Sequence, residues 1–453
     1  MTGASLPHMA ARPAVGARRA GIVFAAAVAA YFVAVVQRTA LGVAGVEAID
    51  RFGLTATGLA MFSVVQLATY ALLQIPAGRL LDRFGARSLI TTGSIVMAVG
   101  QLTLALAVNV PTALVARVLI GAGDAAIFIS AVRLVMQWFP PRRVPVLVQT
   151  TGLLGQAGQL ASAIPVAWLL HAEGWGVTFG TLAVLGLLVA AGANAGIRSP
   201  AVTPDADAAP IPAPERFTHA VRLTVRPAGN RLGFWSHFAT PFSANVITLL
   251  WGVPFFITAQ QRSPAEASLL LTLLTLTAMT AGPIIGRLTG RHPLRRSWMV
   301  LFSCSATLIA WVALLLPSTP RPLWQLALFV MVVGAGGPVS LVGMDFARSF
   351  TPVHRVGTAT GFVNTGGFIS TIAGVLAVGL VLQLVSPPGA QTYSLDAYRL
   401  AFCVLIVPWG AGVLGVLVNR RRTRAVMASD GTVIPPLREV LRRNPSGKDK
   451  DPR

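Results

Sequence analysis

The sequence predicts an all-α membrane protein whose twelve transmembrane helices form two pseudo-symmetric six-helix bundles. Three observations predict this fold class. Hydrophobic residues make up 54% of the chain and charged residues only 11%, whereas soluble domains carry about 25% charged residues. Long apolar runs, each about the 20 residues that cross a bilayer as a helix, alternate with short segments rich in Gly, Pro and Arg. Motifs of the first half also recur in the second half.

The apolar runs set the boundaries of the predicted helices. The first run begins near Ala20 and is long enough to span, so it is interpreted as a helix rather than as a cleavable signal. An N-terminal bundle is expected at residues 20–198 and a C-terminal bundle at residues 232–419. The twelve runs cover residues 20–45, 56–78, 88–108, 112–138, 146–171, 176–197, 233–260, 265–288, 297–316, 323–347, 356–385 and 396–419.

Polar segments flank and separate the two bundles. Residues 1–19 are expected to form a short cytoplasmic tail. Residues 199–231 begin with a stretch rich in Pro, Ala and Asp, which predicts a flexible cytoplasmic linker. Residues 420–453 are basic and polar, and they are expected to form a disordered cytoplasmic tail.

The distribution of arginines gives the orientation. The segments on one side of the predicted helices carry 24 arginines, and those on the other side carry four. Since basic residues remain on the cytoplasmic side, both termini are expected in the cytoplasm of a multi-pass cell-membrane protein. The net charge of +21 is spread over these short segments, which argues against a nucleic-acid partner. The lipid bilayer is the expected environment, and a monomer the expected state.

The sequence gives no sign of an enzyme, a metal site or a cofactor. The two cysteines, Cys304 and Cys403, lie in separate apolar runs without a CxxC pattern, and the six histidines are scattered. A membrane-embedded enzyme would need clustered His, Asp or Glu side chains at the interface. A sensor of the same fold that transports nothing remains an alternative, although the chain has no long signalling domain.

A rare pattern lies between the second and third apolar runs, where Gly78, Asp82, Arg83, Gly85 and Arg87 fall within ten residues. Glycines allow a tight turn, arginines hold it on the cytoplasmic side, and the acid can pair with a cation or a helix N-terminus. The pattern resembles the signature loop between helices 2 and 3 of the major facilitator superfamily of transporters. The resemblance implies alternating access to a site between two six-helix halves.

The second half of the chain repeats the first at shifts of 208 to 213 residues. Three motifs in separate helices recur in this way: Gly78-Arg79-Leu80 with Gly286-Arg287-Leu288, Thr151-Gly152 with Thr360-Gly361, and Gly121-Ala122-Gly123 with Gly334-Ala335-Gly336. The repeat places a substrate site between the halves, near the middle of the membrane.

The repeat also exchanges the positions of two charges. Asp82 corresponds to Gly290, while Arg133 corresponds to Asp345. We therefore expect Asp82 to pair with Arg133, and Asp345 to pair with Arg287 or Arg291. Both pairs would close the cytoplasmic side. The alternative is a set of independent arginines that extend to the membrane surface.

Ionisable side chains inside the apolar runs are few and mark a functional site. Arg38 lies in the first run, and Arg117 and Asp124 lie two helical turns apart on one face of the fourth. Arginines bind carboxylates with two parallel hydrogen bonds, and an acid near them can load and release a proton. Three alternatives remain open: Arg38 extends to the outer interface, Arg117 bonds neighbouring carbonyls, or Asp124 forms only an ion pair.

At these residues the resemblance narrows to the anion:cation symporter family, whose members carry organic acids. Arg38–Ala44 resembles the helix 1 segment of that family, and Arg117–Ala126 resembles its helix 4 motif, which ends near Trp138-Phe139-Pro140. Proton-coupled members often have an Asp before the helix 1 Arg. Here that residue is Gln37, so Asp124 would carry the coupling alone.

Other polar residues in the runs are candidates for lining the substrate cavity, although a polar residue in a membrane helix also serves helix packing. The substrate-binding candidates besides the two arginines are Tyr31, Gln37, Gln156, Asn245, Trp251 and Asn364. Gly152, Gly155 and Gly158 predict close packing of the fifth helix.

The sequence therefore predicts a secondary transporter of a small organic anion, taken up with protons by alternating access. The alternative is an exporter of drugs or metabolites by proton antiport, which shares the fold and the signature loop. Buried arginines favour an anionic substrate, whereas exporters of cations present acids.

Overall fold

The computed structural model describes residues 16–54, 56–198, 216–387 and 392–432, and these residues are helical apart from short connections. The helices of the first half are α1 (Ala17–Val43), α2 (Gly45–Phe52), α3 (Ala56–Leu106), α4 (Val110–Trp138) and α5 (Val144–Gly196). Those of the second half are α6 (Phe217–Val225), α7 (Ala228–Ala239), α8 (Phe242–Val246), a π-helix (Ile247–Trp251), α9 (Gly252–Pro254), a second π-helix (Phe255–Ala259), α10 (Pro264–Arg291), α11 (Arg296–Leu315), α12 (Leu323–Ser340), α13 (Val342–Phe350), a 3₁₀ turn (Val353–Arg355), α14 (Val356–Val385), α15 (Leu395–Cys403) and α16 (Ile406–Ser429).

Ten helical segments of the described chain are long and apolar enough to cross a membrane. Two of them, α3 and α5, are each long enough for two crossings, and each folds back at one glycine. Gly85 has φ 80° and ψ 166°, and Gly174 has φ 78° and ψ −177°, which is a region of backbone space that essentially only glycine occupies. Since α3 and α5 each supply two crossings, the ten segments correspond to the twelve predicted crossings, and the all-helical membrane fold is confirmed.

The predicted turn at residues 78–87 is much shorter than expected. The first limb of α3, residues 56–84, remains helical past Gly78, and Gly85 alone reverses the chain. No proline interrupts residues 78–84, and Leu81 is fully buried there, so continuing the helix satisfies the backbone and buries apolar surface.

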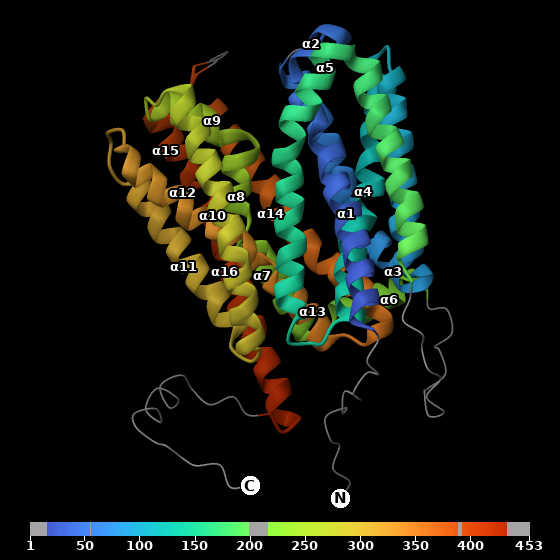
Figure 1. The fold of residues 1–453 in the computed structure, drawn as a ribbon. Helices are drawn as coiled ribbons and strands as arrows, with labels where there is room; N and C mark the ends of the chain where they lie inside the picture. Colours follow the sequence, from blue (N-terminus) through green and yellow to red (C-terminus); the bar gives the residue numbers. More distant parts are fainter. Residues whose placement is uncertain (1–15, 55, 199–215, 388–391, 433–453) are drawn as a thin grey trace, which may run out of the picture.

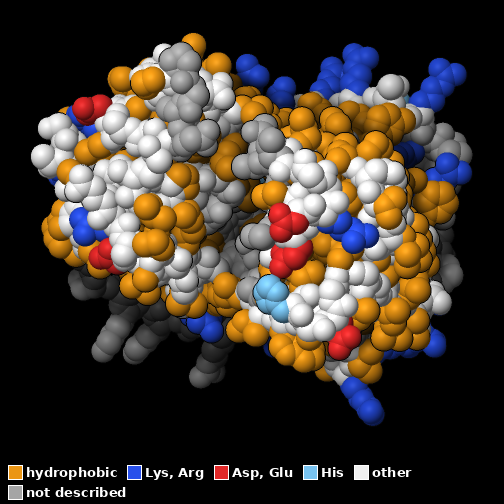
Figure 2. Space-filling model, turned by 90° about the horizontal axis from the view of Figure 1, so that it is seen from above, with side chains coloured by type: hydrophobic (Ala, Val, Ile, Leu, Met, Phe, Trp, Pro, Cys, Tyr) orange, Lys and Arg blue, Asp and Glu red, His pale blue; other side chains and the backbone are white. Residues whose placement is uncertain are grey.

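The two halves form two bundles that meet at one end (Figure 1). We call this end the tail side, because α1 begins there and α16 ends there. Toward the opposite side, where α2 and the α5 reversal lie, the bundles diverge (Figure 1), and the face seen from that side is hollowed between them (Figure 2). The first half packs around one large apolar cluster, while the second half has two.

Two segment boundaries differ from the sequence prediction. The C-terminal tail is not disordered from residue 420, because α16 continues to Ser429. Arg420 fixes this last part of the helix: its Nε donates to Ser297 Oγ at 3.1 Å, and its guanidinium lies 4.4 Å from the Trp298 ring centroid. The predicted linker contains α6, and α7 begins before residue 232. The rest of the predicted linker and of both tails lies outside the described residues.

The seventh predicted crossing, residues 233–260, is irregular. It consists of α7, α8, α9 and two π-helical turns. Pro241 and Pro254 each remove a backbone donor, which prevents a continuous α-helical ladder.

The reversal at Gly85 predicts a stability change. Replacing Gly85 with alanine should cost about 1–3 kcal/mol, because its backbone conformation is unfavourable for any residue with a Cβ. The matched control is Gly42→Ala in α1, where nothing lies within 4 Å of the new methyl group. Alanine has the higher helix propensity there, so this change should be neutral or stabilising. Thermal unfolding in detergent measures both; equal midpoints would contradict the assignment.

Candidate functional site

An ion pair inside the first bundle forms the centre of the site. Arg38 Nε of α1 lies 3.3 Å from Asp124 Oδ2 of α4. The Asp124 side chain is fully buried, whereas the Arg38 side chain is 24% exposed. The Arg38 guanidinium also lies 5.6 Å from the ring centroid of Tyr70, and the Tyr31 side chain lies near it. Solutes can therefore reach part of the Arg38 side chain, whereas the Asp124 carboxylate is enclosed.

Arg117 provides a second buried cation on the same helix as Asp124. It is 3% exposed, and its Nε donates to the Phe62 carbonyl at 3.4 Å. This bond agrees with the alternative that Arg117 bonds neighbouring carbonyls. Its Nη1 has no hydrogen-bond partner among the described residues. Arg38, Arg117 and Asp124 together leave a formal excess of one positive charge within the membrane.

Glycines of α5 allow the side chain of Tyr31 to reach this site. A Cβ on Gly155 would collide with the Tyr31 ring, and one on Gly158 would meet the Phe32 carbonyl oxygen at 2.7 Å. The Tyr31 ring also packs on Phe128 of α4, with centroids 5.1 Å apart. The close packing predicted for this glycine run is thus confirmed: Gly155 and Gly158 pack on α1, whereas a Cβ on Gly152 would lie 3.2 Å from the Leu341 side chain of the second half.

The second bundle reaches the site through Asn364 of α14. Its Nδ2 donates to Gln74 Oε1 at 2.7 Å and to the Tyr70 hydroxyl at 3.4 Å. The Tyr70 ring also packs on Phe368 of α14, with centroids 4.7 Å apart. Arg38 is therefore linked through Tyr70 to the opposite bundle, which places the site between the two halves.

Tyr70 and Gln74 are site residues that the sequence analysis missed. With Gly78 and Asp82 they recur at every fourth position along the first limb of α3, so each lies one turn from the next on the same side of the helix. We call these four residues the α3 row. Their spacing from the signature residues is the signal that could have identified them.

Of the other predicted substrate-binding residues, Gln37 lies inside the first bundle, and the role of Asn245, Trp251 and Gln156 stays a prediction. Gln37 donates from Nε2 to the Leu182 carbonyl of the same bundle at 3.1 Å. Successive residues of a helix point about 100° apart, so Gln37 faces the interior of the first bundle although its neighbour Arg38 faces the site. Asn245 donates to Thr371 Oγ1 at 2.9 Å, and Trp251 donates to the Val375 carbonyl at 3.0 Å, so both connect the seventh crossing to α14. Gln156 is half-buried on α5, and its amide oxygen has no hydrogen-bond partner among the described residues.

The tail side is closed by the carboxylate of Asp82. It accepts hydrogen bonds from Gly357 N and Thr358 N, both at 2.8 Å, and from Thr358 Oγ1 at 2.6 Å. These groups belong to the first turn of α14, where a negative charge is favourable. Arg133 Nη1 lies 2.6 Å from the same carboxylate, so the predicted pair is confirmed. Gly78 packs directly on the backbone of Gly357.

A second contact closes the same side at the position that the repeat predicts. A Cβ on Gly286 of α10 would lie 2.8 Å from Val146 Cα of α5, and one on Gly290 would lie 2.9 Å from the Arg142 carbonyl oxygen. Gln149 of α5 also donates to the Pro338 carbonyl of α12 at 2.7 Å. Gly78 and Gly286, which correspond in the repeat, therefore both lie at bundle-to-bundle contacts.

The pairing predicted for Asp345 is wrong. Asp345 is buried at the start of α13 and pairs with Arg348 of the same helix at 3.1 Å. Arg287 and Arg291 are instead exposed near the end of α10. Burial inside the second bundle keeps this acid away from both arginines.

The remaining basic residues of the signature segment lie at the surface. Arg83 is exposed beside the ring of Phe84, with 5.1 Å from guanidinium to centroid. Arg87 donates from Nε to Asn194 Oδ1 at 3.1 Å, within its own bundle. Asp82 and Gly78 are thus the predicted signature residues that contact the other bundle. No group of three His, Cys, Asp or Glu side chains suited to a metal occurs among the described residues.

Comparison with known proteins identifies the family. The model of the Major Facilitator Superfamily matches residues 27–261 and 233–446. The chain belongs to the Major Facilitator Superfamily. Membership of this superfamily agrees with the multi-pass, all-helical membrane fold described above.

Several curated relatives match part of this superfamily member. The uncharacterized transporter YybO of Bacillus subtilis (strain 168) is 30% identical over 34% of this chain and 35% of its own length. A probable L-galactonate transporter of Escherichia coli (strain K12) is 29% identical over 36% of each chain. A hexuronate transporter of B. subtilis is 26% identical over 34% of this chain and 36% of its own. The matches thus span about a third of these relatives.

A solved structure shares the superfamily fold. It is a bacterial homologue of the human lysosomal transporter Spinster, in an inward-facing and unoccupied conformation. The likeness covers 90% of this chain and 98% of that one, with a TM-score of 0.54 and 16% sequence identity.

The Asp82 contact predicts how the tail side responds to mutation. Thr358→Val removes one hydrogen bond to a carboxylate, which is worth about 1.5–3 kcal/mol, and should shift the protein toward states with an open tail side. Thr360→Val is the matched control, because Thr360 Oγ1 donates only to the Val356 carbonyl of its own helix. Spin labels at the exposed positions Ser88 and Arg291 report the separation of the bundles. Equal distance distributions in both variants would contradict the role of this contact.

Proposed function

We propose that the protein is a secondary active transporter that moves a small organic anion across the cell membrane together with protons, by alternating access. The ion pair between the partly exposed Arg38 and the enclosed Asp124 is the observation that carries this proposal. It presents a cation to solutes between the bundles, and it keeps a titratable acid beside that cation.

The charge balance favours an anion. Arg38 and Arg117 outweigh Asp124 by one positive charge, and a buried charge without a partner is costly. A substrate carboxylate would neutralise this excess and could accept two parallel hydrogen bonds from the Arg38 guanidinium. Tyr31 and Tyr70 lie beside the Arg38 guanidinium, and their hydroxyl groups can donate to further oxygens of the substrate.

Coupling to protons follows from competition for one guanidinium. When a substrate carboxylate pairs with Arg38, Asp124 loses its partner in a site that excludes water. An isolated buried carboxylate is strongly disfavoured, so Asp124 takes up a proton as the anion binds. When Asp124 releases its proton, it pairs with Arg38 again and displaces the anion. Substrate and proton therefore move in the same direction.

Alternating access requires the closed contacts of the tail side to open. With both termini in the cytoplasm, the closed tail side and the diverging opposite side correspond to an outward-facing state. To face inward, the first turn of α14 must leave Asp82, Asn364 must leave Gln74, and α10 must separate from α5. The same helices thus connect the substrate site to the cytoplasmic closure.

The names of the curated relatives support the substrate class. Two of them are named as transporters of L-galactonate and hexuronate, which are carboxylates with several hydroxyl groups. We infer a small hydroxylated carboxylate as the substrate of this chain, because such an anion matches one exposed guanidinium with two tyrosines beside it.

Uptake into proteoliposomes tests the proposal with a panel of sugar acids and an inward proton gradient. Arg38→Ala should reduce uptake at least about tenfold, since a charge-assisted bidentate contact is lost. Asp124→Asn should abolish accumulation driven by the gradient while exchange of labelled for unlabelled substrate continues. Glu47→Gln is the matched control, since Glu47 lies outside the site and faces His171. Accumulation by Asp124→Asn in response to the gradient would refute the coupling role.

A further inference from the structure

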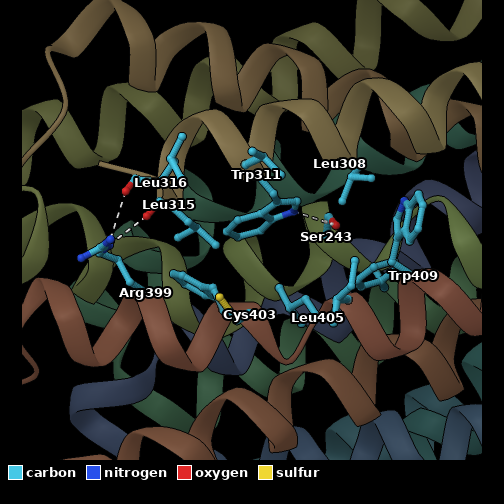
Figure 3. A pocket seen from close by; sticks show the side chains of 13 residues that line it. Ser243, Leu308, Trp311, Leu315, Leu316, Arg399, Cys403, Leu405 and Trp409 are labelled. Carbon is cyan, nitrogen blue, oxygen red and sulfur yellow. Dashed lines mark hydrogen bonds between the residues drawn. The ribbon is translucent and has the colours of Figure 1, made fainter. Parts of the chain in front are cut away.

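A cavity of about 480 Å³ lies in the second bundle, away from the Arg38 site. Its walls come from α11, from α15 and α16, and from α8 (Figure 3). Phe242, Trp311 and Phe402 are its buried apolar walls. The volume falls within the range of about 300–1000 Å³ that is typical of small-molecule sites.

A proline opens this space between the helices. Pro408 of α16 has no backbone N–H, and the helix is interrupted four residues earlier, at Val404 and Leu405. Val407 N donates to the Val404 carbonyl at 3.0 Å, which is a tighter turn than that of an α-helix. The crossing therefore bends at the level of the cavity and leaves the gap beside α11.

The cavity opens toward lipid. Val312 of α11, Leu316 directly after it and Ile406 of α16 line it and are 52%, 74% and 51% exposed. Both helices are long and apolar enough to cross a membrane. Ser243 is a polar residue of the inner wall, and its hydroxyl oxygen already accepts a hydrogen bond from Trp311 Nε1 at 3.1 Å (Figure 3). An occupant must therefore be apolar along most of its length.

One charged pair stands at the end of the cavity nearest the side opposite the tails. Arg399 donates from Nε to the Leu315 carbonyl at 2.8 Å, from Nη2 to the Leu316 carbonyl at 3.0 Å, and from Nη1 to Asp396 Oδ1 at 2.7 Å. A guanidinium has five N–H donors, so two remain for a ligand. The Asp396 side chain is 75% exposed, and its second oxygen can accept from one.

We propose that this cavity binds one acyl chain of a phospholipid with an ethanolamine-type headgroup, in the leaflet opposite the tail side. The chain fills the apolar space, the phosphate accepts from the free N–H groups of Arg399, and the primary ammonium donates to Asp396. A paired cation and anion match a headgroup that carries both charges. A choline headgroup has no N–H and offers Asp396 no hydrogen bond.

The native cysteine in the cavity provides the measurement. Cys403 lines the cavity and is exposed, while Cys304 is buried. Alkylation of Cys403 by N-ethylmaleimide is followed in delipidated full-length protein in detergent, in a Cys304→Ser background. Dioleoyl phosphatidylethanolamine should slow the reaction at a concentration about tenfold lower than dioleoyl phosphatidylcholine needs, since one charge-assisted hydrogen bond distinguishes them.

Two variants separate headgroup recognition from general lipid contact. Asp396→Asn keeps the bonds of Arg399 to α11 and should abolish the preference for phosphatidylethanolamine. Ile309→Cys in a background with Cys304→Ser and Cys403→Ser is the matched control, because Ile309 of α11 is 69% exposed but does not line the cavity. Neither lipid should protect it selectively.

Three results would overturn the proposal. In the first, the two lipids protect Cys403 equally. In the second, the new thiol of Ile309→Cys is protected as strongly as Cys403. In the third, a sugar acid protects Cys403 when lipid does not. The last result would place the cavity on the transport route. The measurement does not depend on transport, so its failure would leave the proposed function untouched.

Discussion

The structure depends on the cost of keeping charge in a medium of low dielectric constant. Asp124 is fully enclosed and has Arg38 as its ion-pair partner, while Arg38 is partly open to the space between the bundles. Whatever anion pairs with Arg38 must change the electrostatic state of Asp124. In the proposed mechanism, this single ion pair links binding to protonation, and the surrounding helices position its two members.

The α3 row connects this pair to the distant closure. Tyr70 lies beneath the Arg38 guanidinium, Gln74 bonds Asn364, Gly78 packs on Gly357, and Asp82 holds the first turn of α14. All four members contact α14 of the other bundle, and Gly78 and Asp82 share its first turn. In the proposed mechanism, this limb is the physical connection between the substrate site and the tail-side closure.

The sequence predicted what local chemistry dictates. Apolar runs predicted the crossings, and charge exchange predicted the pair of Asp82 with Arg133. The repeat matched Gly78 with Gly286, and the structure places both at bundle-to-bundle contacts. It could not predict contacts that depend on the rotation of each helix, so Gln37 was assigned to the site although it faces Leu182. Asp345 was assigned to the wrong arginines for the same reason, and Tyr70 was missed because a lone tyrosine carries no distinctive local pattern.

The most direct measurement is the number of protons taken up when the anion binds. Calorimetric titration of purified protein with a transported sugar acid, in buffers of different ionisation enthalpy, reports this number without any membrane gradient. The account predicts about one proton bound per anion by the native protein and none by Asp124→Asn, because the acid that loses Arg38 must be neutralised. Binding without proton uptake by the native protein, or equal uptake by both, would contradict it.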